Sequence, residues 1–171
     1  MRPGKILHPQ VAEALASLGH GDIILVTDAG APIPSGIKRI DLAFCAGSVD
    51  LIEILHVLRG EIFIENVIFA EEVPENNPNL LQRVTDIFTG SGADFLLIPH
   101  QKLVAEIYHS ARVIIRSGSL MPWGNFALVA STDPDAWFDD SMKIIPEYVE
   151  RSAKIKNGAV PVIKKYSTVT K

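Results

Sequence analysis

The apolar residues of this 171-residue chain switch repeatedly between short continuous runs and a helical spacing. Ile23–Val26 is a continuous run typical of a strand covered on both faces, whereas Val11, Ala14 and Leu18 share one face of a helix. The pattern predicts strands at 23–26, 39–44, 62–70, 95–98, 113–115 and 126–130, and helices at 11–18, 49–58, 77–88 and 103–111. Ser48 is the candidate N-cap of the second helix, and Asn77 followed by Pro78 is expected to begin the third. Strands that alternate with helices favour a three-layer α/β/α fold with a largely parallel central sheet in a single domain.

The alternation of strands and helices stops near residue 131, where the regular spacing of apolar residues is lost. Residues 1–131 are expected to form the α/β domain, and residues 132–171 a C-terminal extension with weak patterning. The acidic start of the extension carries Trp137 and Phe138, which would be costly to leave in water. Two alternatives remain at this point: the extension packs on its own domain, or it docks on a neighbouring subunit.

Charge and cysteine content exclude several classes of partner and suggest a compartment. A formal net charge of −4 and a pI near 5.7 argue against nucleic acid or an anionic membrane surface as a partner. No apolar run approaches the ~20 residues of a membrane span, and no secretory signal is evident at the N-terminus. Cys45 is the single cysteine, so no internal disulfide forms and a cytoplasmic location is expected.

The residues around the first expected strand are the first candidates for catalysis. His20 lies between the first helix and this strand, and Asp28 follows the strand into a loop rich in glycine and proline. Histidine with a carboxylate can move protons near neutral pH, so His20 is the candidate general acid/base and Asp28 the group that orients it. The plainer alternatives are that His20 only caps a helix and that Asp28 only closes an Asx turn.

A second set of candidates would bind substrate. His100 and Lys102 lie where a strand passes into a helix, although they are also compatible with an ordinary helix start and a solvated charge. Trp123 and Asn125 lie in a loop rich in glycine, proline and polar residues between the last two strands. An aromatic face beside an amide suits a sugar, because the ring takes the C–H surface and the amide both donates to and accepts from hydroxyls.

Several colinear motifs together resemble those of the D-ribose pyranase and L-fucose mutarotase family. They are Leu-Gly-His-Gly-Asp at 18–22, Asp-Ala-Gly-Ala-Pro-Ile-Pro at 28–34, Arg-Ile-Asp at 39–41, Ala-Glu-Glu at 70–72 and Arg-Ser-Gly-x-x-x-Pro-Trp-Gly-Asn at 116–125. The resemblance covers about residues 5–130, and the 28–34 motif is similar to the ribose branch. The family usually has tyrosine where this chain has Trp123 and glutamate where it has Ser119.

The resemblance implies a cofactor-free sugar isomerase built as a ring-shaped homo-oligomer, a pentamer or decamer, with sites at subunit boundaries. It carries over His20, Asp28, His100, Trp123 and Asn125 as site residues. The chemistry agrees, because interconverting the ring forms of a monosaccharide such as D-ribose needs only an acid and a base to open a hemiacetal. We therefore expect no metal ligands, and no Gly-x-Gly-x-x-Gly motif suggests a dinucleotide.

Two alternatives to a ribose-type isomerase remain open. One is a non-catalytic monosaccharide-binding or transport-accessory protein, and the other is a mutarotase for a different sugar such as fucose. Only an enzyme accelerates exchange between ring forms, whereas all three would bind a sugar.

Overall fold

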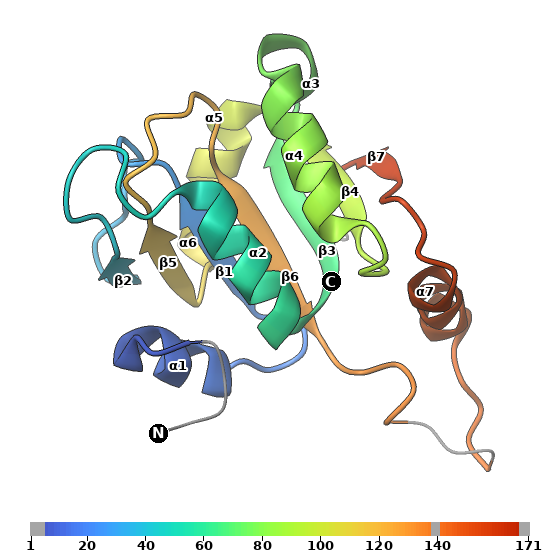
Figure 1. Ribbon diagram of the computed structural model, residues 1–171. Coiled ribbons are helices and arrows are strands. Elements are labelled where there is room, and N and C mark those ends of the chain that lie inside the picture. Colours follow the sequence, from blue (N-terminus) through green and yellow to red (C-terminus); the bar gives the residue numbers. More distant parts are fainter. Residues whose placement is uncertain (1–5, 138–140, 168–171) are drawn as a thin grey trace.

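Seven strands form one mixed sheet in the computed structural model, which describes residues 6–137 and 141–167 (Figure 1). The strands are β1 (Ile23–Thr27), β2 (Lys38–Asp41), β3 (Phe63–Ala70), β4 (Asp94–Ile98), β5 (Val113–Arg116), β6 (Phe126–Ser131) and β7 (Ile163–Lys165). Their order is β2-β5-β1-β6-β3-β4-β7, and β6 runs antiparallel to both neighbours while the other pairs are parallel. The carboxyl ends of β1, β3 and β4 therefore meet the start of β6 at one edge of the sheet.

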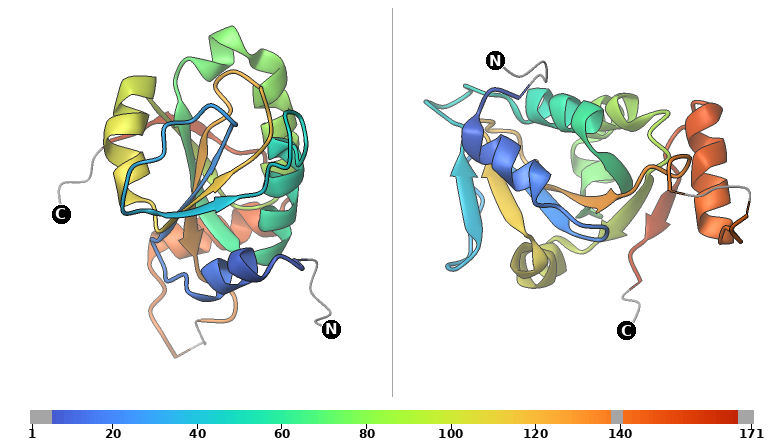
Figure 2. Two further views of the ribbon diagram at one scale, coloured as in Figure 1. Left: turned by 90° about the vertical axis from the view of Figure 1, so that its left-hand side faces the viewer. Right: turned by 90° about the horizontal axis from the view of Figure 1, so that it is seen from below.

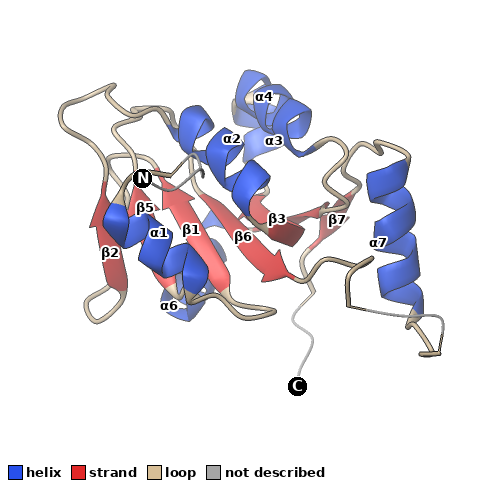
Figure 3. Ribbon diagram, turned by 60° about the horizontal axis from the view of Figure 1, so that its bottom comes forward, coloured by secondary structure: helices blue, strands red, loops and turns tan. Residues whose placement is uncertain are grey.

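Helices cover both faces of the sheet, so the predicted three-layer α/β/α class is confirmed (Figures 2 and 3). They are α1 (Pro9–Ala16), α2 (Leu51–Glu61), α3 (Val73–Asn76), α4 (Pro78–Phe88), α5 (His100–Lys102), the π-helical turn η1 (Leu103–Ile107), α6 (Tyr108–Ser110) and α7 (Pro146–Lys156). The α2 and α4 helices lie together on one face, and the α5–α6 segment lies on the other. In the core, the Phe69 ring contacts both Phe95 and Phe126.

Two element boundaries differ from the sequence prediction because side chains form caps that the apolar pattern does not reveal. The second helix begins at Leu51 with Asp50 as N-cap, not Ser48, and Glu53 completes a capping box. The Ser48 hydroxyl instead accepts the backbone N–H groups of Phe44 and Cys45. The expected strand at 39–44 ends at Asp41, and Phe44 is 95% exposed in the loop that follows.

The C-terminal extension contains two regular elements that its weak pattern did not predict. Helix α7 precedes β7, which pairs in parallel with β4 of the same chain and so becomes the outermost strand on that side of the sheet. Trp137 is 66% exposed, and Phe138 lies outside the described residues. None of the described helices is long and apolar enough to cross a membrane.

Candidate active site

Four of the predicted site residues lie at the carboxyl edge of the sheet. Asp28 follows β1 directly, His100 begins the helix after β4, and Trp123 and Asn125 immediately precede β6. Because β6 runs antiparallel, its start lies beside the end of β1, and Phe126 pairs with Val26. Residues as far apart in sequence as Asp28 and Asn125 thus come into contact.

A chain of hydrogen bonds fixes the orientation of the Asn125 amide. Its Nδ2 donates to Asp28 Oδ2 at 3.1 Å, and the Tyr108 hydroxyl donates to its Oδ1 at 3.0 Å. Burial, with a further contribution from the Asp28 carboxylate, raises the pKa of Tyr108, so the phenol remains a neutral donor. The other Asp28 oxygen accepts the Gly30 N–H at 2.8 Å, so the predicted Asx-type turn is present as well. The Asn125 amide and the Gly30 N–H thereby hold the two oxygens of Asp28 in place.

The loop that carries Trp123 and Asn125 is anchored to the end of β1. The Ser117 hydroxyl donates to the Thr27 carbonyl at 2.7 Å, and the Ala29 N–H donates to the Ser119 carbonyl at 2.9 Å. Trp123 has a φ of 66°, a left-handed conformation that is rare for a bulky residue. Residues in such sparsely populated backbone conformations cluster at functional sites.

The half-buried His100 joins this group through an aromatic contact. Its ring meets that of Trp123 edge to face, with centroids 5.2 Å apart. Both oxygens of the Glu72 carboxylate accept the His100 backbone N–H at 3.2 Å, which holds the start of α5 in place. Lys102 is exposed in the next part of the turn, and among the described residues it has no hydrogen bond or ion pair to the other four.

His20 lies at the opposite edge of the sheet, so the expectation that Asp28 orients it is wrong within one chain. His20 precedes β1 and Asp28 follows it, and the five residues of this strand alone span about 17 Å. Because only one strand separates His20 from Asp28 in the sequence, the two side chains were expected to lie close together. The two ends of a strand, however, lie at opposite edges of the sheet.

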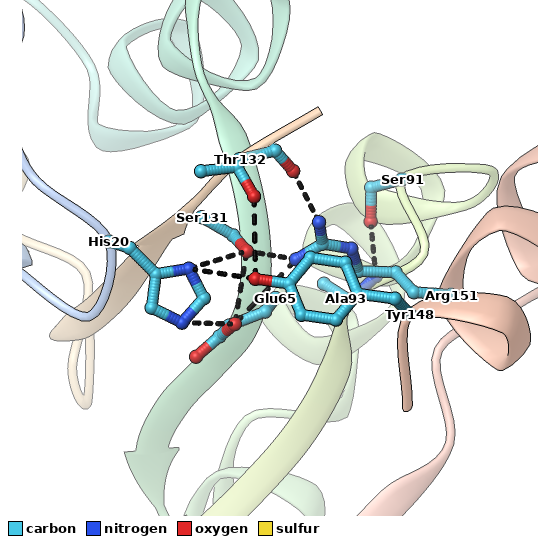
Figure 4. A network of polar contacts seen from close by, with 8 residues as sticks. All are labelled: His20, Glu65, Ser91, Ala93, Ser131, Thr132, Tyr148 and Arg151. Atoms are coloured by element: carbon cyan, nitrogen blue, oxygen red, sulfur yellow. Dashed lines mark hydrogen bonds and ion pairs between the residues drawn. The ribbon is translucent and has the colours of Figure 1, made fainter. Parts of the chain in front are cut away.

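The neighbours of His20 come instead from β3, β6 and α7 (Figure 4). Its Nε2 lies 3.7 Å from Glu65 Oε2, and its Nδ1 lies 3.3 Å from the Tyr148 hydroxyl and 3.5 Å from Ser131 Oγ. Glu65 is the extra residue where the pairing of β3 with β6 shifts register. Such a bulge re-aims a side chain, and here it directs the carboxylate toward the imidazole.

An open pocket of about 640 Å³ adjoins His20. Most of its wall is apolar, with Leu15, Leu18, Ile62 and Phe63 beside the exposed Trp137. Ser131, Thr132, Asp133 and Tyr148 add polar groups to this wall beside His20.

Sequence reasoning missed four polar residues that the structure brings to the group around Asp28 or to the group around His20. Tyr108 and Glu65 lay within an expected helix and an expected strand, and Tyr148 and Arg151 lay in the weakly patterned extension. No local signal marks them, because their partners are distant in the chain. Over the described parts of the chain, no three His, Cys, Asp or Glu side chains group as metal ligands would.

If Trp123 forms one wall of a sugar site, its removal should weaken binding. We expect Trp123→Ala to raise the sugar concentration for half-maximal effect roughly three- to tenfold, the contribution of an aromatic contact. Trp137 is the second of two tryptophans, so a Trp137→Phe background isolates the Trp123 fluorescence. An emission that responds to no sugar in this background would assign Trp123 to packing alone.

Three comparisons with known proteins agree on one family. A model of the RbsD / FucU transport protein family matches residues 1–132. D-ribose pyranase 1 of Streptomyces griseus is 39% identical over 147 residues, covering 86% of this chain and 96% of that relative. D-ribose pyranase 2 of Rubrobacter xylanophilus is 36% identical over 148 residues, covering 86% and 95%. The structure of Bacillus subtilis RbsD complexed with D-ribose superposes with a TM-score of 0.73 at 31% identity, covering 78% of this chain and 99% of that one.

Proposed function

The chain belongs to the RbsD / FucU transport protein family, and we propose that it is a sugar isomerase that interconverts the ring forms of D-ribose. The observation that carries the proposal is the convergence of Asp28, Asn125, His100 and Trp123 at one edge of the sheet. These groups offer a hydrogen-bond acceptor, an oriented amide, an imidazole and an aromatic face, which together suit a small polyhydroxylated ring.

The reaction needs proton transfers alone. A base removes the proton of the anomeric hydroxyl and, as the conjugate acid, then gives a proton to the ring oxygen, so that the bond between the anomeric carbon and the ring oxygen breaks. Closure of the open chain through a different hydroxyl, or onto the other face of the carbonyl, gives the second ring form. Acid–base assistance of this kind contributes about 10²- to 10⁴-fold, enough for a reaction that already proceeds in water.

We assign the proton transfers to His20, supplied by a neighbouring copy of the chain. Within one chain His20 and Asp28 lie at opposite edges of the sheet, so a site that uses both must combine two subunits. The His20 side chain is 46% exposed and adjoins the apolar pocket, which leaves it accessible to a second subunit. A closed ring, a pentamer or decamer, repeats one such heterologous contact at every boundary.

Magnetisation-transfer NMR on free sugars tests the activity directly. We expect the protein to accelerate exchange between the pyranose and furanose forms of ribose, with fucose as the comparison sugar. Binding detected by calorimetry without faster exchange would instead identify a sugar-binding or transport-accessory protein. Faster exchange of fucose than of ribose would change the substrate but not the reaction. A cytoplasmic location forms part of the proposal and is supported by the single cysteine.

Mixing two inactive variants tests the shared site. His20→Ala and Asp28→Asn subunits, unfolded and reassembled together in equal amounts, should recover about a quarter of the wild-type exchange, because one boundary in four pairs an intact His20 with an intact Asp28. Each variant reassembled alone is the control and should remain inactive. Light scattering that finds a monomer with full activity, or a mixture that recovers nothing, would contradict the shared site.

A further inference from the structure

Helix α7 lies beyond the residues that the family model matches, yet it contacts the surroundings of His20. The superposition with the B. subtilis structure covers 99% of that chain but 78% of this one, so the extension has little counterpart there. The match to the S. griseus relative spans 147 residues and therefore continues past residue 132. Some members of the family thus match part of this extension, and others do not.

Specific contacts dock α7 onto its own chain. Gly92 has a φ of 78°, and a Cβ there would lie 2.8 Å from side-chain atoms of both Arg151 and Ile155, so a residue without a side chain permits the close approach. Lys154 and Lys164 donate to the two oxygens of Asp94 at 2.9 and 2.6 Å. Burial acts to raise the pKa of Asp94, but hydrogen bonds from the two lysines outweigh it and hold that pKa below its usual range. The helix is therefore seated by packing and by charge.

Arg151 links the helix to the end of β6. Its guanidinium is buried and donates to the Ser131 hydroxyl and the Thr132 carbonyl, and it lies 3.6 Å from Glu65 Oε2. The same guanidinium lies 5.0 Å from the ring centroid of Tyr148, a cation–π arrangement. Arg151 thus fixes both the Tyr148 ring and the carboxylate that faces His20 (Figure 4).

The hydroxyl of Tyr148 is placed to control the imidazole of His20. It lies 3.3 Å from Nδ1, and the two rings stack with centroids 6.2 Å apart and an interplanar angle of 23°. A phenol donates to Nδ1 when that atom is bare and accepts from it when it carries a proton, so one contact serves both protonation states. Nε2 faces the Glu65 carboxylate at 3.7 Å, an ion-pair distance that is too long for a hydrogen bond, so a sugar hydroxyl can still bond to this nitrogen.

We propose that Tyr148 is a positioning residue for His20, holding Nδ1 so that Nε2 faces the substrate. This inference rests on the proposed function, in which His20 transfers the protons. It gives the extension a role in catalysis. The hydrogen-bond partner of the second ring nitrogen orients a catalytic histidine, and in this chain that partner comes from α7, outside the residues that the family model matches.

Tyr148→Phe tests the inference, because it removes the hydroxyl and keeps the ring over Arg151. We expect the maximal exchange rate to fall roughly three- to tenfold, the loss of one hydrogen bond, with the half-saturating ribose concentration unchanged. In ¹⁵N-labelled free protein, the two ring nitrogen shifts of His20 should also change, since they report which nitrogen is bonded and protonated. Tyr166→Phe, in the same extension, is the matched control and should alter neither quantity.

The outcomes separate this inference from the proposed function. Unchanged nitrogen shifts would overturn it, and so would changed shifts with a full exchange rate, because the hydroxyl would then bind His20 without aiding the reaction. A rise in the half-saturating concentration alone would also overturn it, since Tyr148 would be contacting the sugar. A wild-type protein that accelerates no exchange overturns the proposed function and is recognised before any variant is compared.

Discussion

Replacing His20 by alanine should slow the catalysed exchange at least about 100-fold, because a general acid/base contributes 10² or more to such a reaction. The fold should be unaffected, since the His20 side chain is 46% exposed and lies outside the core. Magnetisation-transfer NMR with ribose measures the rate, and circular dichroism measures the fold. The loss should appear in the maximal rate more than in the half-saturating concentration, as expected for a group that acts in the transition state.

His56→Ala is the matched control, because His56 is an exposed histidine in the middle of α2. It should retain the full exchange rate. A His20→Ala protein that keeps more than about a tenth of the wild-type rate would contradict the assignment of His20 as the acid/base. The proton carrier would then be sought at the carboxyl edge, where His100 is the other imidazole.

Gly118→Ala should be the most destabilising single substitution in the loop that carries Trp123 and Asn125. A Cβ at Gly118 would lie 2.0 Å from the Ser48 carbonyl oxygen and 2.8 Å from that of Cys45. Both atoms are backbone, so one of the two loops must move. We expect a loss of about 3 kcal/mol in the free energy of unfolding, the upper end for overpacking. The melting temperature should fall by roughly 10 °C for a chain of this size.

The displaced loop should also carry Trp123 and Asn125 away from Asp28 and reduce the exchange rate. Gly19→Ala is the control for stability, since a Cβ there would meet Asp22 Oδ2 at an ordinary 3.7 Å. Differential scanning calorimetry on the three proteins checks the prediction. Equal melting temperatures for Gly118→Ala and the wild type would mean that the 42–50 loop yields without cost.

Local patterns in the sequence determined most of the elements. The run Ile23–Val26 forms most of β1, with Ile24–Val26 buried, and Asn77 with Pro78 begins α4 as predicted. The Asn77 side chain accepts the Leu80 N–H. These signals act over a few residues, so they can be recognised without knowledge of the rest of the chain. Capping by Asp50 rather than Ser48 shows their limit, because both residue types cap helices well.

The sequence also singled out Asp28, His100, Trp123 and Asn125 as candidates, since loops at the ends of expected strands stand out from the apolar pattern. Only the tertiary structure decided which of them meet. The contact between Asn125 and Asp28 joins residues 97 apart, and it depends on β6 running antiparallel beside β1. The contact between Tyr148 and His20 joins residues 128 apart and depends on where α7 docks. Strand order, strand direction and the bulge at Glu65 arise from packing over the whole chain, and no local spacing of residues encodes them.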